Sequence, residues 1–481
     1  MSVSTNSLES LCELIVDCPH STPTWTDEGI VVLRNQNIKS GVLDLSSPSF
    51  TNEEDYQKRI KRADPQAGDI VFTREAPMGE VCMIPEGLKC CLGQRQVLLR
   101  PKKSINGKYL FWALQSPFVQ HQISWNEGTG STVSNVRIPV LKALNIPRHP
   151  RQEDQIAEVL SNVADKIQLN RQTNQTLEQI AQAIFKSWFV DFEPVKAKAI
   201  VKQKGGNELA QSLAAQACIC GAISLEQLQD LENDFLGLEE QLHPLITERF
   251  PDEFGLDYWS PETLHAIADL FPNTLVESEL GEVPEGWVHG TLSDIACYSS
   301  DRIDVAELTH QNYVSTENML ESKNGITDAT ALPNVKTVPS YQKGQVLVSN
   351  IRPYFKKIWF ARRDGGRSAD VLGFDSLEEG CEEFLYNVLY QDRFFDYMMQ
   401  GSKGAKMPRG DKVAIMNYVV PLSPVQVRVA FSRLVAQFYE HIESQLSQNL
   451  TLCQLRDTLL PKLLSGELSL DQARAKKEAV A

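Results

Sequence analysis

The sequence predicts an α+β protein: two tandem mixed α/β domains separated by two long antiparallel helices that form an intramolecular coiled coil. Three observations predict this fold. Apolar residues recur with a period of seven over residues 152–188, and the pattern returns about 275 residues later. A polar layer interrupts both helices at the same point, and the segments before the two helices resemble each other. Two unrelated amphipathic helices that share a period by chance would not also share their flanking sequence.

The heptad pattern defines the contact face of each predicted helix. In the first helix, the two heptad positions are filled by Ile156, Val163, Asn170, Leu177 and Ile184, and by Leu160, Ile167, Asn174, Ala181 and Trp188. In the second helix they are filled by Phe431, Phe438, Gln445, Leu452 and Leu459, and by Val435, Ile442, Asn449, Arg456 and Leu463. A polar layer inside an apolar seam specifies register. We therefore predict that the register is set by Asn170, Asn174, Gln445 and Asn449.

The region before each helix is a copy of the other. The offset between the copies drifts from about 284 residues at the start to about 275 at the helices, which is what short loop insertions produce. The matching segments are Gly68–Pro77 with Gly344–Pro353, Tyr109–Leu114 with Phe384–Leu389, the Gly-containing loops Glu127–Arg137 with Gln400–Gly410, and Pro147–Pro150 with Pro421–Pro424. The chain therefore contains a tandem duplication, with Ser423 expected to cap the second helix.

Within each repeat the pattern is mixed. Short β-branched or apolar runs bounded by turn residues predict strands at Ile30–Leu33, Asp69–Phe72, Val97–Leu99, Gln345–Val348 and Lys357–Phe360. Helices are predicted near Lys108–Gln115 and, in the second copy, near Cys381–Met399. Each repeat is expected to be a compact α+β domain at one end of its helix.

The domain division follows from these features. We predict a first domain at 1–150, a central spacer helix at 151–194, an acidic helical connector at 195–285, a second domain at 286–424, a C-terminal spacer helix at 425–470 and a tail at 471–481. Within the connector, Lys196–Gly206 is expected to be a loop, Glu208–Leu242 helical, and Ser278–Trp287 a linker into the second repeat.

The net charge of −15 is confined to one part of the chain. Residues 151–285 hold 9 Lys and Arg against 24 Asp and Glu, whereas the regions on either side are close to neutral. Local basic clusters in the two repeats can therefore still contact phosphates.

No reaction can be assigned from motifs. The chain has no P-loop, no GxGxxG turn after a strand and no HExxH or other metal-ligand spacing. A nuclease-like match can be forced from Pro251-Asp252 with Glu321 and Lys323, but 62 acidic residues make such a match expected by chance. No signal pattern and no long apolar run is present, and ten scattered cysteines without a CxxC pair indicate reduced thiols. We expect a soluble cytoplasmic chain that binds no metal or cofactor and no membrane.

Two similar domains braced by paired helices suit a DNA duplex with two half-sites. A helix of about 36 residues is about 54 Å long and can act as a ruler whose intervening base pairs are not read. Arg and Asn side chains can contact base edges, and Lys mostly contacts phosphates. The candidate DNA-binding residues are Arg74, Thr129, Ser131, Thr132, Asn135, Arg137, Arg352, Lys356, Lys357, Lys403, Lys406 and Arg409. Any one of them, like the weaker cluster Lys58, Arg59, Lys61 and Arg62, can instead be a solvated surface charge.

The segments Gln155–Ala199 and Leu450–Leu468, together with Gly130–Pro147 and Ser278–Trp287, resemble the specificity subunits of type I restriction–modification enzymes. The resemblance covers nearly the whole chain, although IPRHPRQEDQ stands where the family usually has prolines and acidic residues before the first helix. It implies a non-catalytic subunit whose two target recognition domains read an asymmetric bipartite site in double-stranded DNA. It also implies two methylation subunits that use S-adenosylmethionine, and restriction subunits that use ATP and Mg²⁺.

Two other hypotheses remain open from the residues alone. A stand-alone DNA-binding regulator would bind one site tightly by itself and be soluble alone. A protein-binding scaffold with the same duplicated architecture would show an interaction that does not depend on salt, because only phosphate contacts weaken steeply as salt rises.

Overall fold

The computed structural model describes residues 4–125, 135–230, 244, 260–278, 281–400 and 408–468. The chain forms two compact units, Met1–Gln172 with Gln445–Ala481 and Thr173–Ser444. The boundaries between the units pass through two long helices, so each unit contains one part of each helix. The domain limits predicted above stay predictions.

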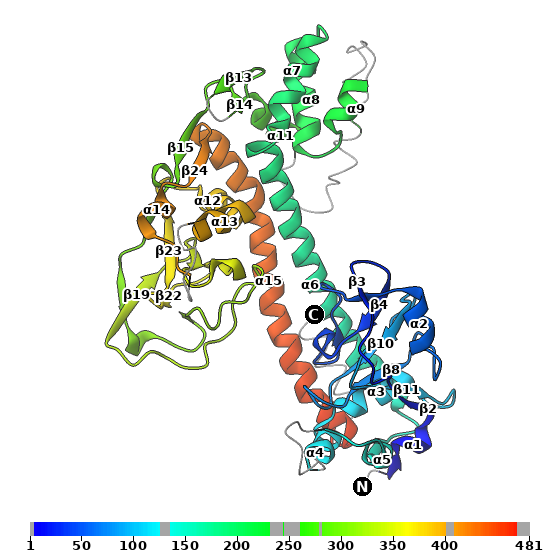
Figure 1. The fold of residues 1–481 in the computed structure, drawn as a ribbon. Helices are drawn as coiled ribbons and strands as arrows, with labels where there is room; N and C mark the ends of the chain where they lie inside the picture. Colours follow the sequence, from blue (N-terminus) through cyan, green and yellow to red (C-terminus); the bar gives the residue numbers. More distant parts are fainter. Residues whose placement is uncertain are drawn as a thin grey trace. The chain divides into compact units, whose positions relative to one another are not determined.

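The two long helices are α6 (Glu153–Phe189) of 37 residues and α15 (Val425–Leu464) of 40 residues, drawn as continuous helices in Figure 1. In the first unit, Val163 and Ile167 of α6 form a buried cluster with Leu452 of α15. In the second unit, Trp188 near the end of α6 packs against Phe431 near the start of α15. In the first unit, Ile156 and Leu160 share a core with Leu459 and Leu463, whereas Val163 and Ile167, further along α6, lie with the earlier Leu452 of α15. The helices therefore run antiparallel there, as the heptads predict.

The start of α15 differs from the expected cap. The Ser423 hydroxyl is shielded from solvent and has no hydrogen-bond partner among the described residues. The Pro424 carbonyl instead accepts the first backbone hydrogen bond, from Val427 N at 3.0 Å. The prediction that Ser423 caps this helix is wrong. The residue directly before the helix is Pro424, whose side chain cannot accept a hydrogen bond.

The main sheet of the first unit is antiparallel, in the order β2-β11-β8-β9. Its strands are β2 (Cys12–Asp17), β11 (Gln96–Pro101), β8 (Ile70–Thr73) and β9 (Val81–Met83). Helices α3 (Gly107–Gln115) and α4 (Pro117–Trp125) follow β11. One core joins this sheet and α3 to Ile156 and Leu160 of α6 and to Leu459 and Leu463 of α15.

The second unit repeats this topology. Its main sheet has the order β16-β23-β20-β21, and it is also antiparallel. The strands are β16 (Ala296–Tyr298), β23 (Val371–Ser376), β20 (Val346–Ser349) and β21 (Ile358–Phe360), followed by helices α12 (Glu382–Tyr390) and α13 (Asp392–Gln400). The helix expected near Cys381–Met399 is thus two helices, as it is in the first unit. The core again includes both long helices, here with Phe185 and Trp188 of α6 and Phe431 and Val435 of α15.

A short antiparallel strand pair closes each repeat just before its long helix. In the first unit β1 (Ser4–Ser7) pairs with β12 (Asn145–Arg148), and in the second β15 (Val288–Thr291) pairs with β24 (Val419–Leu422). The matching registers, Ser4 with Arg148 and Val288 with Leu422, show that the duplication extends to individual pairings.

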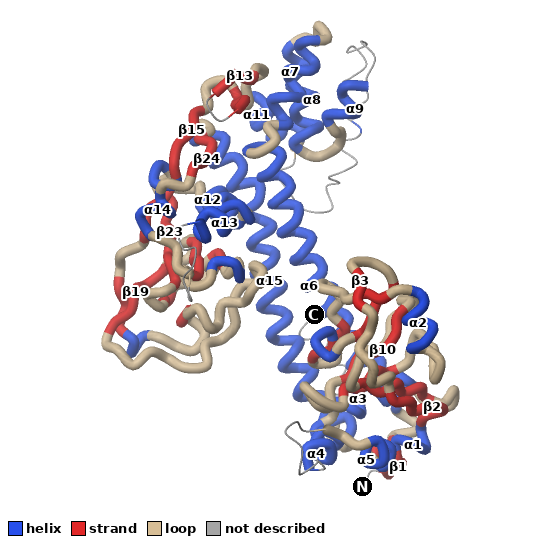
Figure 2. Tube along the Cα trace, viewed as in Figure 1, coloured by secondary structure: helices blue, strands red, loops and turns tan. Residues whose placement is uncertain are grey.

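The second sheets are less alike. In the first unit the order is β10-β4-β7-β3, and in the second it is β17-β19-β22-β18. These strands, red in Figure 2, are β10 (Cys90–Leu92), β4 (Ile30–Leu33), β7 (Phe50–Thr51), β3 (Trp25–Thr26), β17 (Arg302–Asp304), β19 (Thr337–Tyr341), β22 (Gly365–Arg367) and β18 (Tyr313–Val314). Each sheet contains one parallel pair, β4 with β10 and β18 with β22. The other two strands extend the sheet from β4 in the first unit and from β22 in the second.

Part of the connector is more ordered than the sequence predicts. Residues expected to form a loop from Lys196 to Gly206 lie largely in α7 (Glu193–Gln203), so that prediction is wrong. Helix α7 has an apolar face among its polar residues, because Ala197 and Val201 are buried against α8 (Glu208–Ile219). Helices α9 (Leu225–Asp230) and α11 (Pro261–Asp269) follow in the described residues.

The expected linker into the second repeat is also structured. Strands β13 (Leu275–Ser278) and β14 (Gly281–Pro284) pair as an antiparallel hairpin. Trp287 is buried in the core of the second unit, next to Phe189 and Phe192. Among the described helices, none is both long and apolar enough to span a membrane. All ten cysteines lie in the described residues, and none of them forms a disulfide there.

Candidate nucleic-acid interface

In the first unit the end of β8 is joined to the segment that follows the Gly-containing loop. The carbonyl of Arg74 accepts a hydrogen bond from Val136 N at 3.1 Å, and the Arg74 side chain donates from Nε to Val136 O at 3.0 Å. Asn135 and Arg137 flank Val136, so the structure brings three of the predicted residues together. The candidates Thr129, Ser131 and Thr132 lie outside the described residues.

Arg74 is engaged within the domain. Its Nη1 donates to both carboxylate oxygens of Asp17 at 3.0 Å, and only 14% of its side chain is exposed. The guanidinium thus links β2 to the chain that leaves the Gly-containing loop. It holds the segment that follows the loop at Val136, and a direct base contact by Arg74 would require the ion pair with Asp17 to open.

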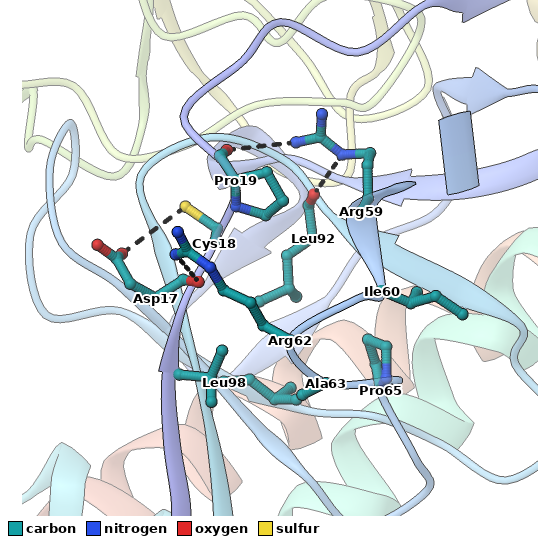
Figure 3. Close-up of a pocket in the computed structure, with 11 residues that line it drawn as sticks. Asp17, Cys18, Pro19, Arg59, Ile60, Arg62, Ala63, Pro65, Leu92 and Leu98 are labelled. Atoms are coloured by element: carbon teal, nitrogen blue, oxygen red, sulfur yellow. Dashed lines mark hydrogen bonds between the residues drawn. The ribbon is translucent and has the colours of Figure 1, made fainter. Parts of the chain in front are cut away.

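The basic cluster near α2 (Glu53–Arg59) is also committed to internal contacts. Figure 3 shows Arg59 turned inward, where Nε donates to Leu92 O at 3.0 Å and Nη2 to Pro19 O at 3.4 Å. Arg62 donates to Asp17 O at 3.3 Å, and Lys58 pairs with Glu54. The hollow between these groups is about 10 Å³, barely enough for one water molecule. Arg59 is therefore a structural residue that presents no charge to a phosphate.

The second unit repeats the connection between strand end and loop. Arg352 N, three residues after β20, donates to Pro408 O at 2.9 Å, and Ile351 forms a β-bridge with Arg409. Arg409 is 56% exposed at its side chain and pairs with Asp370 at 3.2 Å. The candidates Lys403 and Lys406 lie outside the described residues. In both copies, therefore, the turn that follows β8 or β20 lies beside the end of the Gly-containing loop.

The other two candidates hold the turn that follows β20. Lys357 donates to Thr316 O at 2.9 Å, and the Lys356 ammonium lies 3.0 Å from Asp392. Lys323, which was not among the DNA-binding candidates, also reaches Asp392 at 2.6 Å. The hydrogen bond from Lys323 is the main reason why the pKa of Asp392 is lowered, with Lys356 adding to it.

Lys323 lies on a hairpin that sequence reasoning missed. Residues Met319 and Ile326 form a β-bridge, and Ser322 and Lys323 in the turn between them have positive φ values of 57° and 63°. The Asn324-Gly325 pair in this turn is a hairpin signal that the sequence already contains. No sequence signal pointed to Asp392, because it begins a helix about 70 residues away.

Where the helices pair in the first unit, the predicted polar layer is partly formed. Asn170 is 1% exposed and donates from Nδ2 to Gln448 Oε1 at 2.7 Å and to Asn449 Oδ1 at 3.0 Å. Gln445 is partly buried. Asn174, in the second unit, has both side-chain polar atoms shielded and without a hydrogen-bond partner among the described residues. That these residues set the register remains a prediction.

Within the described ranges, no group of three or more His, Cys, Asp or Glu side chains is arranged to hold a metal ion. What the two copies share is a backbone hydrogen bond between the turn after β8 or β20 and the end of the Gly-containing loop, with arginine side chains close to it. Such groups suit binding to a polyanion.

Comparisons with known proteins agree with this description. Residues 7–179 match the family model of the type I restriction modification DNA specificity domain. The HindI specificity subunit of Haemophilus influenzae, a type I restriction enzyme subunit, is 28% identical over 350 residues, which cover 68% of this chain and 69% of that protein. The MjaIX specificity subunit of Methanocaldococcus jannaschii is 25% identical over 410 residues, which cover 84% of this chain and 78% of that protein.

A solved structure also aligns over most of the chain. The crystal structure of the type I restriction–modification S subunit from M. genitalium covers 96% of this chain and 95% of its own, with a TM-score of 0.49 and 14% identity. Residues 7–179 thus carry the DNA specificity domain of type I restriction–modification enzymes, and the chain is similar over most of its length to their specificity subunits, which recognise DNA and are not catalytic.

Proposed function

We propose that the chain reads an asymmetric bipartite site in double-stranded DNA, with one half-site for each repeat. The observation that carries this proposal is that in both units the turn after the matching strand is hydrogen-bonded to the end of the Gly-containing loop, through different positions: Val136 N donates to Arg74 O in the first unit, and Arg352 N donates to Pro408 O in the second. Each copy thus holds the turn that follows β8 or β20 against the end of its Gly-containing loop. The side chains on these loops differ between the copies, so we expect the half-sites to differ in sequence.

The two long helices are the proposed docking surface for two methylation subunits. In the first unit, Leu446 and Leu450 lie one turn apart on α15 and are 51% and 69% exposed, and Leu169 on α6 is 55% exposed. Large apolar side chains exposed on paired helices are typical of surfaces that a protein partner covers. This supports a subunit of a complex over a stand-alone regulator.

The chemistry of the complex would be carried by the partners. We expect the methylation subunits to use S-adenosylmethionine to modify adenine, and the restriction subunits to use ATP and Mg²⁺ in the cytoplasm. This chain would contribute only the choice of sequence. Its DNA contacts are expected to weaken as salt increases, because phosphate binding releases counterions.

Methylation mapping tests this function. The chain would be produced with its methylation subunits in a host that lacks other modification systems, and modified adenines would be located by sequencing. We expect one bipartite motif with an adenine modified on each strand. Replacing residues 1–150 by the matching region of a relative should change only one half of the motif.

Two results would contradict the proposal. If an intact complex modified no motif, the proposal that this chain reads a DNA sequence would be wrong. A change in both halves after replacement of residues 1–150 would remove the assignment of one half-site to each repeat.

A further inference from the structure

The turn between β20 and β21 has an unusual backbone. Arg352 and Lys356 have φ values of 51° and 50°, in the left-handed region that non-glycine residues rarely adopt. Between them, Pro353–Phe355 form a short 3-10 helix, and Pro353 is buried. Non-glycine residues persist in this conformation only where the surrounding structure determines it, and such residues cluster at functional sites.

The turn is held from several sides. Arg352 N bonds to Pro408 O, while Ser322 N donates to Phe355 O at 2.8 Å and Lys323 N donates to Lys356 O at 2.9 Å. The last two bonds come from the Met319–Ile326 hairpin. The hairpin and the turn are also joined through Asp392, which lies between the Lys323 and Lys356 ammonium groups. The tip of the turn is therefore fixed before any ligand binds.

Two side chains leave this fixed tip toward solvent. Arg352 is exposed, and its guanidinium makes no hydrogen bond or ion pair with the described part of the chain. Tyr354 is 49% exposed, and its hydroxyl likewise has no partner among those residues. The Tyr354 ring packs beside Phe355, with 4.5 Å between the ring centroids. The tip thus presents an aromatic face, a free hydroxyl and a free cation next to one another.

These groups match a nucleic-acid base. An aromatic ring can stack on a base or lie against the methyl group of thymine, a hydroxyl can donate to or accept from a base edge, and arginine can bond guanine or a phosphate. Restricting the side chains to a rigid turn lowers the entropy lost on binding.

The first unit does not offer the same tip. Pro77 and Pro353 occupy the same place in the two repeats, but the next residue is Met78 in the first and Tyr354 in the second. Met78 is partly buried and packs against the core of its unit. An aromatic contact from this turn would therefore be confined to the half-site of the second repeat.

We propose that Tyr354 is a specificity-determining residue that contacts one base pair of the half-site read by the second unit. Lys323, Lys356 and Asp392 are positioning residues that hold the turn. The proposal rests on the proposed function and adds to it a residue and a half-site.

The test uses the complex of the full chain with its methylation subunits and short duplexes that carry the mapped motif. Each base pair of both half-sites is replaced in turn, and the dissociation constant is measured for wild type, Tyr354→Ala and Tyr354→Phe. We expect Tyr354→Ala to weaken binding to the motif about tenfold to a hundredfold. We also expect it to lose discrimination at one position of the second half-site and none in the first. Leu377→Ala, which truncates another exposed side chain of the same unit, serves as the matched control and should leave both unchanged.

The phenylalanine variant separates the two contacts that tyrosine can make. Retained discrimination in Tyr354→Phe assigns the contact to the ring, and lost discrimination with retained affinity assigns it to the hydroxyl. Unchanged binding by Tyr354→Ala, or an equal loss on every duplex, would overturn the proposal. Failure of the wild-type complex to discriminate any duplex would instead overturn the proposed function.

The positioning role has its own readout. Asp392→Ala should reduce discrimination at the same base pair as Tyr354→Ala. The unfolding midpoint of the chain should change no more than it does after substitution of an exposed surface residue. Asp392→Glu should restore it by again pairing with both ammonium groups. Loss at other base pairs, or a failure of glutamate to restore discrimination, would show that Asp392 does not act through Tyr354.

Discussion

At the scale of single residues, Glu178 is a carboxyl group placed where charge is poorly solvated. It lies on α6 within the second unit, where Gln182 Nε2 is 3.4 Å and the Tyr439 hydroxyl 3.5 Å from its Oε1. Asn387 of α12 bonds to the same hydroxyl at 2.9 Å, so the group belongs to a polar cluster that joins three helices. Burial raises the pKa of Glu178 to about 7, although Gln182, Arg362, Tyr439 and Lys323 act in the opposite direction.

Glu178 should make stability depend on pH. Because its pKa is raised in the folded chain, the group contributes fully below its ordinary value of 4.5, and that contribution is lost as pH rises through about 7. Glu178→Gln should therefore raise the free energy of unfolding at pH 8 by about 1–2 kcal/mol and leave it nearly unchanged at pH 4.5. Urea unfolding of the full chain at the two pH values measures this. The exposed Glu440→Gln is the matched control, and a destabilised Glu178→Gln variant at pH 8 would contradict the argument.

At the scale of elements, the paired helices combine apolar packing with buried amide side chains, among them Asn170 and Asn449. The side chain of Asn170 bonds to Gln448 and Asn449 from the opposite helix within the first unit. A buried amide that loses its partner keeps the cost of desolvation without the hydrogen bond. Removing one side of the pair should therefore cost more than removing both.

A double-mutant cycle tests that pairing. Asn170→Leu alone should lower the free energy of unfolding by about 1–3 kcal/mol, because the amide of Asn449 is left without its partner. Adding Asn449→Leu should recover most of the loss, since two apolar residues of similar size then pack in the seam. Urea unfolding of the four variants gives the coupling energy. Additive losses would show that Asn170 and Asn449 do not act as a pair, and would remove them as the register determinant.

At the scale of the whole molecule, the two units share their long helices. Each recognition core is completed by helix segments that are far away in sequence, such as Leu459 of α15 in the first unit and Phe185 of α6 in the second. The residues of one repeat and its own helix therefore do not complete a core by themselves. Each repeat also needs the long helix that follows the other repeat. This makes the helices part of both domains as well as the connection between them.

The proposed ruler predicts the effect of lengthening both helices. Seven residues inserted between Gln172 and Thr173, matched by seven between Ser444 and Gln445, keep the heptad register and add about 10 Å to each helix. The unread gap of the methylated motif should then grow by about three base pairs, at about 3.4 Å per base pair. Sequencing of modified adenines measures the gap. An insertion in α6 alone breaks the pairing and should abolish methylation, whereas an unchanged gap after the matched insertion would rule out the ruler.

The sequence by itself determined the features that depend on periodicity and repetition. The seven-residue period placed both long helices and most of their contact face, because a helix must bury a continuous apolar stripe. The duplication implied a common topology, and the pairings of Ser4 with Arg148 and Val288 with Leu422 confirm it. Both inferences use local signals that survive divergence of the individual side chains.

Only the tertiary structure decided which charged and polar side chains are available. The Arg59 side chain donates to backbone carbonyls and Arg74 pairs with Asp17, whereas Tyr354 is exposed at the tip of a rigid turn. The sequence likewise did not reveal the helix from Glu193 to Gln203, because its apolar face is recognisable only from its packing against α8. Charge in a sequence does not reveal its partner, because ion pairs and hydrogen bonds join residues that the chain brings together from a distance.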